Sequence, residues 1–134
     1  MKVFFDENFS PHLARGFAAF QEGRMAEERV EVLHVVDEFG KGTTDEDLIS
    51  HIARQHGAMI TQDYNIHRTR HLADLCRQHK IGIFFFRPPK KSPLTYWQLI
   101  EWVLKNWQSV KHYAVNTDTP YEFEITPRKG LTKL

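Results

Sequence analysis

The sequence contains a single cysteine and no long apolar run. One cysteine, Cys76, cannot form a disulfide within the chain, which is typical of proteins in a reducing compartment. Its helical spacing from Leu72 and Leu75 predicts a buried thiol rather than a nucleophile. The longest apolar segment, residues 81–86, is far shorter than the ~18 residues that a membrane span needs. Residues 1–6 lack the apolar stretch of a secretion signal. We therefore expect a cytoplasmic protein that does not enter a membrane.

The chain also lacks a strong net charge, because 18 Lys and Arg offset 17 Asp and Glu to leave +1. The charge is unevenly distributed, however. Residues 67–91 hold seven Lys or Arg against one acid, so this segment carries +6 and the remainder carries −5. A basic stretch beside acidic groups suits an enzyme that acts on a polyanion, although the same residues could simply form a solvated helix face.

The 134 residues are 41% hydrophobic and contain no repeat or low-complexity linker, which predicts one domain over residues 1–134, with a strand or tail at about 112–134. Apolar runs alternate with helical patterns along the chain. Strands are predicted at 2–5, 30–36, 58–61, 81–86 and around 121–125, and helices at about 11–20, 44–56, 67–79 and 94–110. Gly57 is expected to end the helix at 44–56 as its C′ residue. This alternation predicts an α/β fold in three layers, with a mostly parallel central sheet flanked by helices.

Three aspartates occupy matching places in this pattern. Asp6 and Asp63 follow the first and third predicted strands, and Asp45 opens the helix between them. In an open α/β sheet, strand carboxyl ends and the helix starts beyond them line one crevice where ligands bind. Carboxylates gathered there repel each other unless a cation neutralises them, and hard divalent ions suit carboxylates best. The pattern predicts a metal site, with ordinary turn and helix-cap roles for the same residues as the alternative.

Two segments carry a family resemblance. Residues 5–11 read FDENFSP, and in residues 44–63 Asp45 opens a helix while a strand ends in Thr61-Gln62-Asp63, with the second aspartate eighteen residues after the first. Over roughly residues 2–90 the chain resembles the short PIN-like domains. Proteins of that family are typically metal-dependent ribonucleases, and many are toxins paired with an antitoxin.

The resemblance implies an Mg²⁺- or Mn²⁺-dependent endoribonuclease that is the toxin of a toxin–antitoxin pair, with the metal held by Asp6, Asp45 and Asp63 and with RNA as substrate. Hydrolysis would use metal-activated water. In this scheme Asn8 orients the attacking water or a phosphate oxygen.

RNA contacts are expected just beyond the third aspartate. Arg68 and Arg70 would hold the RNA backbone, which positions the substrate without reading its sequence. Tyr64 would stack on an unpaired base, unless it simply packs against its loop. Asn65 would supply an amide to a phosphate or a water.

Two alternatives to the ribonuclease stay open. Many relatives carry a further acid where this chain has Asn65, so the protein could be a catalytically degenerate PIN-like module that binds only RNA or a protein. A phosphatase for small molecules is the other alternative, and the basic segment argues against it by favouring a polymer. His67 and His71 have the i, i+4 spacing of zinc ligands, but no Glu or Cys accompanies them, so zinc is not predicted.

The helix at 94–110 is apolar around most of its circumference, which predicts burial on several sides. Either an antitoxin or a second copy of the chain in a homodimer could cover it, or it could form core beneath the tail strand.

Overall fold

A computed structural model describes all 134 residues and forms one six-stranded sheet in the order β2-β1-β3-β4-β5-β6. The first five strands pair in parallel, and β6 pairs antiparallel to β5. The strands are β1 (Lys2–Phe5), β2 (Glu31–His34), β3 (Ala58–Gln62), β4 (Gly82–Phe86), β5 (Tyr121–Thr126) and β6 (Gly130–Lys133). The helices are α1 (Pro11–Glu22), α2 (Met25–Glu28), α3 (Val35–Phe39), α4 (Asp45–Arg54), α5 (Ile66–His79) and α6 (Tyr96–Asn116). The predicted α/β fold with a mostly parallel sheet is confirmed.

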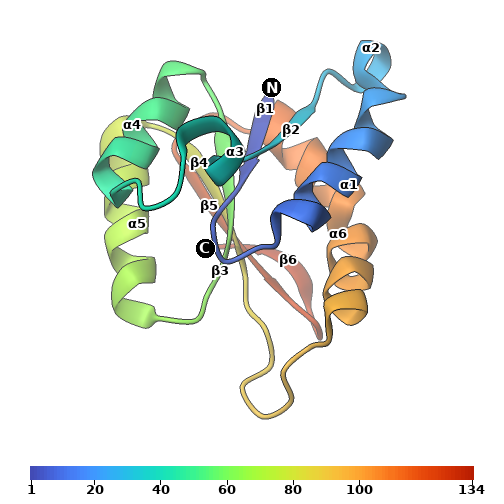
Figure 1. Cartoon of the computed structure of the whole chain (residues 1–134). Coiled ribbons are helices and arrows are strands. Elements are labelled where there is room, and N and C mark those ends of the chain that lie inside the picture. The colour runs from blue at the N-terminus through green and yellow to red at the C-terminus, as the bar shows by residue number, and fades with distance from the viewer.

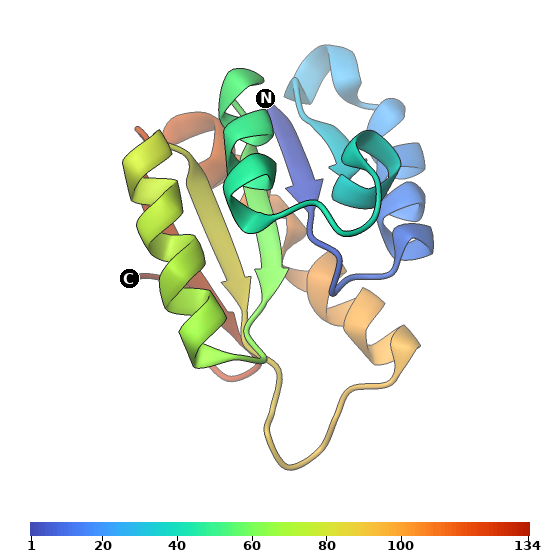
Figure 2. The same cartoon turned by 60° about the vertical axis from the view of Figure 1, so that its left-hand side comes forward.

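Helices cover both faces of the sheet, with α1 and α6 on one side and α4 and α5 on the other (Figures 1 and 2). On the α1–α6 face, Phe17 packs on Trp107 with ring centroids 5.1 Å apart, above Phe5 of β1. On the other face, Ile49 of α4 and Cys76 of α5 are fully buried. The predicted burial of the single cysteine is therefore confirmed. None of the helices combines the length and apolar character that a membrane span requires.

The strand order reverses between β1 and β3, because α1 leads to β2 on one side while β3, β4 and β5 are added on the other. In doubly wound sheets this reversal point is where ligands bind, beyond the carboxyl ends of the strands. The backbone N–H of Asp6 donates to the carbonyl of Ile60 at 2.9 Å, so β1 and β3 remain joined up to this point. The topology thus places the ends of both strands side by side.

One crossover departs from the others. The β3–α5–β4 and β4–α6–β5 connections step in the same direction across the sheet, yet α5 and α6 lie on opposite faces. Their hands are therefore opposite, whereas nearly all such connections share the right-handed sense. The β4–α6–β5 connection is the exception, because the connections through α1 and α4 have the same hand as that through α5. The consequence is that α6 lies beside α1.

Two predicted boundaries near the first motifs were wrong. The strand predicted at 30–36 ends at His34, because its Nδ1 accepts a hydrogen bond from the N–H of Val36 at 3.1 Å and caps α3. The left-handed residue after α4 is His56, with φ of 55°, and not Gly57. Gly57 is needed for a different reason, since a β-carbon there would lie 2.7 Å from Cε2 of Phe4.

The helix predicted at 94–110 is longer and less buried in the structure than expected. Thr95 caps α6 reciprocally with Gln98, and the helix continues to Asn116. Trp102 and Trp107 pack on the sheet, but Trp97 is 71% exposed, so only one face is buried. The predicted last strand is confirmed, and it is joined by β6, which was not predicted.

Candidate active site

A cavity of about 440 Å³ lies beside the strand-order reversal and carries most of the predicted acidic residues. Its walls come from the end of β1, the loop after α3, the start of α4 and the start of α5. Three acids and one arginine line it, which leaves a formal charge of −2 and attracts cations. The lining residues are Asp6, Glu7, Asn8, Val35, Gly40, Thr43, Asp45, Leu48 and Arg68.

Asp6 is the most buried acid of the cavity, with a side chain only 1% exposed. Its Oδ2 accepts hydrogen bonds from the hydroxyl of Thr61 at 2.7 Å and from Nη1 of Arg68 at 2.9 Å. Its Oδ1 is buried and has no hydrogen-bond partner. Buried carboxylate oxygens are rarely left unpaired, so Oδ1 keeps a free acceptor position that a bound cation could fill.

Asp45 also lines the cavity. Thr44 caps α4 by accepting from the N–H of Asp47 at 3.2 Å, which fixes Asp45 in the first turn. The Asp45 side chain is 22% exposed, in agreement with the predicted inward position. Its Oδ1 accepts from Nη2 of Arg68 at 3.1 Å. One guanidinium therefore bridges the two carboxylates.

Arg68 was predicted to hold RNA, but in this structure it forms ion pairs with Asp6 and Asp45 and offsets part of their negative charge. Burial lowers the pKa of Arg68, but hydrogen bonds and charges from Asp6 and Asp45 outweigh that effect and hold the pKa above its ordinary value. The guanidinium is thus a permanent positive charge between two carboxylates. Both of its hydrogen bonds join charged groups and are therefore stronger than a neutral hydrogen bond.

Asn8 and Gln62 join the ends of β1 and β3. The Asn8 amide donates to the Gln62 carbonyl at 2.9 Å and to the Thr61 hydroxyl at 3.1 Å, and it accepts from the Gln62 N–H at 3.1 Å. The Gln62 side chain returns a bond to the Asn8 carbonyl at 2.7 Å. Because Thr61 in turn donates to Asp6, this network holds the Asp6 carboxylate in place.

Asp63 does not join the other two aspartates. Its Oδ2 lies 3.1 Å from Nη2 of Arg87, and its Oδ1 accepts from the Thr69 hydroxyl at 2.6 Å. Arg87 follows β4 and also contacts Glu124 of β5 at 2.8 Å, so neighbouring strands hold Asp63 away from the cavity. No group of three acidic, imidazole or thiol side chains lies close enough to hold a metal ion. Three aspartates were expected at one site, but only Asp6 and Asp45 line the cavity.

The remaining predicted residues surround the start of α5. Asn65 is its N-cap, since Oδ1 accepts from the N–H of His67 at 3.0 Å and of Arg68 at 3.3 Å. Tyr64 is 68% exposed and donates to the Gln62 side chain at 2.5 Å. Arg70 is exposed, and its side chain makes no hydrogen bond or ion pair.

Sequence reasoning did not identify Thr61, Gln62 and Arg87 as site residues. Thr61 and Gln62 are polar positions at the end of an otherwise apolar buried strand, and that signal could have identified them. For Arg87 no such signal exists, because its partners come from two other strands.

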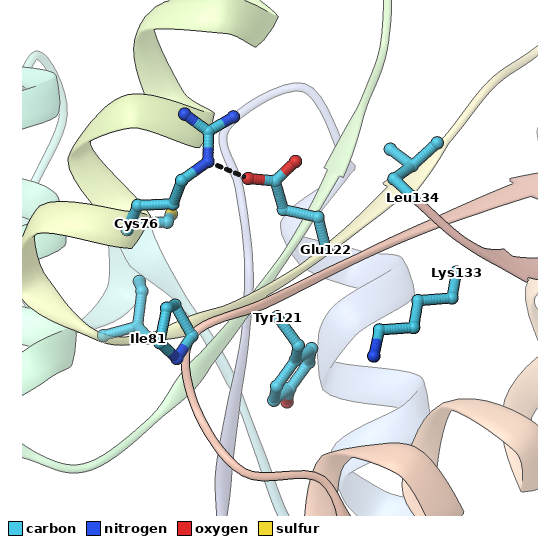
Figure 3. A pocket seen from close by; sticks show the side chains of 8 residues that line it. Cys76, Ile81, Tyr121, Glu122, Lys133 and Leu134 are labelled. Carbon is cyan, nitrogen blue, oxygen red and sulfur yellow. Dashed lines mark hydrogen bonds and ion pairs between the residues drawn. The ribbon is translucent and has the colours of Figure 1, made fainter.

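A second cavity, of about 370 Å³, lies at the amino ends of β4 and β5, away from the aspartates (Figure 3). Arg77 donates to Glu122 there at 2.7 Å, so these two charges are paired, and Lys133 is the other charged side chain of the lining. Burial raises the pKa of the Cys76 thiol, which lines the same cavity and is therefore poorly nucleophilic. This cavity offers no comparable chemistry.

Comparison with known proteins agrees with this geometry. A family model described as a PIN-like domain matches residues 1–88. The chain belongs to the PIN-like domain family. No curated protein and no solved structure matches it. The match includes β1 to β4 and every residue that lines the acidic cavity. In this PIN-like protein α6, β5 and β6 lie beyond the matched segment, although they extend the same sheet. Membership points to the PIN-type nuclease superfamily, whose domains generally use divalent metal ions.

Proposed function

We propose that this PIN-like protein is a metal-dependent endoribonuclease, that it hydrolyses RNA at the acidic cavity, and that it is the toxin of a toxin–antitoxin pair. The observation that carries the proposal is the pair Asp6 and Asp45 at one negatively charged cavity, with one buried Asp6 oxygen unpaired. The basic segment at 67–91 adjoins this cavity through Arg68.

The residues present fit a hard divalent cation. Mg²⁺ is usually held by one or two protein carboxylates, with waters and substrate phosphates as its other ligands. Asp6 and Asp45 supply two carboxylates, and Oδ1 of Asp6 supplies an oxygen that no protein group occupies. A bound Mg²⁺ or Mn²⁺ would activate water and stabilise negative charge on the scissile phosphate.

The other site residues have supporting roles in this proposal. Thr61 orients the Asp6 carboxylate, and Asn8 holds Thr61 and the end of β3. Asp63 would reach a metal only after giving up its ion pair with Arg87, so we assign it an outer role.

RNA would lie over the carboxyl edge of the sheet. Arg70 is exposed and free to contact a phosphate, and the exposed ring of Tyr64 can stack on a base. A cavity of about 410 Å³ continues from Asp63 and Tyr64 to the loop after β4, where Lys90 adds positive charge. Arg68 can reach a phosphate only when it leaves the two carboxylates.

Calorimetric titration with Mn²⁺, paired with cleavage of a structured RNA mixture, tests the proposal. Binding and EDTA-sensitive cleavage are expected in the wild type and should be lost in Asp6→Asn and Asp45→Asn. Asp47→Asn is a matched control, because Asp47 is exposed in the same helical turn and does not line the cavity. Equal cleavage by the wild type and Asp6→Asn would refute the assignment.

A binding module without catalysis is the second candidate, and one observation favours it. Arg68 already pairs with Asp6 and Asp45, while Arg87 pairs with Asp63, so each of these aspartates has a positively charged partner within the protein. RNA binding that survives EDTA, with no cleavage at any metal concentration, would identify this alternative. The toxin role is tested by induced expression, where wild type but not Asp6→Asn should arrest growth.

A further inference from the structure

The Arg68 side chain occupies the space between the two carboxylates that would hold the metal. Its two terminal nitrogens lie 2.9 Å from Oδ2 of Asp6 and 3.1 Å from Oδ1 of Asp45. These are the only polar contacts of its side chain. The guanidinium of Arg68 carries one positive charge and a divalent cation carries two, so the two repel each other when both lie between these carboxylates.

We propose that Arg68 is a built-in counter-cation that competes with the divalent metal for Asp6 and Asp45, and that metal binding displaces its guanidinium from the cavity. The proposal rests on the proposed function, because it requires that this pair of carboxylates holds a metal.

The exchange requires only a side-chain rotation. The backbone of Arg68 is fixed by the Asn65 cap, whose Oδ1 accepts from the Arg68 N–H at 3.3 Å. Its side chain is 36% exposed, so the guanidinium can turn toward solvent without unfolding α5. Exposed side chains change rotamer on the picosecond-to-nanosecond scale, far faster than backbone rearrangement.

The competition has two consequences. A metal ion at this pair must either replace the two charge-assisted hydrogen bonds of Arg68 or overcome repulsion from its guanidinium, so the apparent metal affinity is lower than that of the bare carboxylate pair. The displaced guanidinium remains at the rim of the cavity, where it becomes available to an RNA phosphate. In this way metal binding would create an anion contact that the metal-free protein lacks.

The test is Mn²⁺ affinity measured by calorimetry on the wild type, Arg68→Gln and Arg70→Gln, with no RNA present. Arg68→Gln removes the competing charge and should bind Mn²⁺ about 10- to 100-fold more tightly. Arg70→Gln removes the same charge from an exposed position two residues further along α5, where the side chain has no partner. Its Mn²⁺ affinity should therefore equal that of the wild type. Arg68→Lys keeps a charge that cannot bridge both carboxylates, so it should bind with intermediate affinity.

Thermal unfolding supplies a second readout. In EDTA, Arg68→Gln should have a lower melting temperature than the wild type, because Asp6 and Asp45 are left without a cation. Mn²⁺ should raise the melting temperature of Arg68→Gln by more than it raises that of the wild type. Equal Mn²⁺ affinities in the wild type, Arg68→Gln and Arg68→Lys would overturn this inference while leaving the metal site standing. Absence of Mn²⁺ binding in all of these proteins would overturn the proposed metal-dependent function itself, and the inference with it.

Discussion

Replacing Asp6 by Asn tests the centre of the candidate site through stability as well as activity. If Asp6 and Asp45 repelled each other in the metal-free protein, removal of one charge would raise the melting temperature. The structure predicts the opposite, because Arg68 bridges both carboxylates and Thr61 donates to Asp6.

The magnitude follows from the contacts of Asp6. An asparagine can still accept from both Thr61 and Arg68 through its single Oδ1. Each hydrogen bond then contributes ~0.5–1.5 kcal/mol to stability, as for a neutral acceptor, in place of the ~1.5–3 kcal/mol for a charged one. Its amide nitrogen then takes the place of the buried Oδ1. Breaking a fully buried ion pair costs ~3–5 kcal/mol, and the partial exposure of Arg68 reduces this. We expect a loss of about 2–3 kcal/mol, or roughly 6–12 °C for a chain of this size.

The assay is thermal and urea unfolding in EDTA, with Asp47→Asn as the control. That exposed substitution should change the free energy of unfolding by less than about 0.5 kcal/mol. A double-mutant cycle of Asp6→Asn with Arg68→Gln should show a coupling of at least about 1 kcal/mol. A melting temperature of Asp6→Asn above that of the wild type would refute the reasoning, since the carboxylates would then be unneutralised.

Three further predictions concern the scaffold. Gly82→Ala should lower the free energy of unfolding by more than the ~1–3 kcal/mol that is usual for overpacking, because its β-carbon would lie 1.8 Å from Cζ of Tyr121. In urea unfolding, adding Tyr121→Ala should recover part of that loss. The Cys76 thiol, buried and with a raised pKa, should resist iodoacetamide in the folded protein and react once urea unfolds it; rapid native alkylation would contradict its burial. The hydrogen bond from Arg15 holds the pKa of Asp37 below its ordinary 3.8, so this pair contributes stability above pH 3.8 and loses it as the pH falls further. Asp37→Asn should therefore weaken the acid dependence of urea unfolding below pH 3.8.

Local patterns in the sequence predicted most of the scaffold. Apolar runs and helical periodicity identified β1, β3, β4 and β5, since each side chain's preference acts within a few residues. Thr44 before the acidic first turn marked the start of α4, because an N-cap is satisfied by its own neighbours. The same logic placed Asp6 at a strand end and Asp45 at a helix start, and a parallel sheet brings those ends together.

Only the tertiary structure decided how the charges are paired. Asp63 has the local sequence of a site residue, yet it is held by Arg87, which follows β4, together with Thr69 of α5. Arg68 was expected to face RNA but lies between Asp6 and Asp45. Which face of α6 is exposed likewise depends on the side of the sheet on which the β4–α6–β5 connection places the helix. Ion pairs and crossover hand depend on distances between segments remote in the chain, whereas sequence periodicity reports only what neighbouring residues prefer.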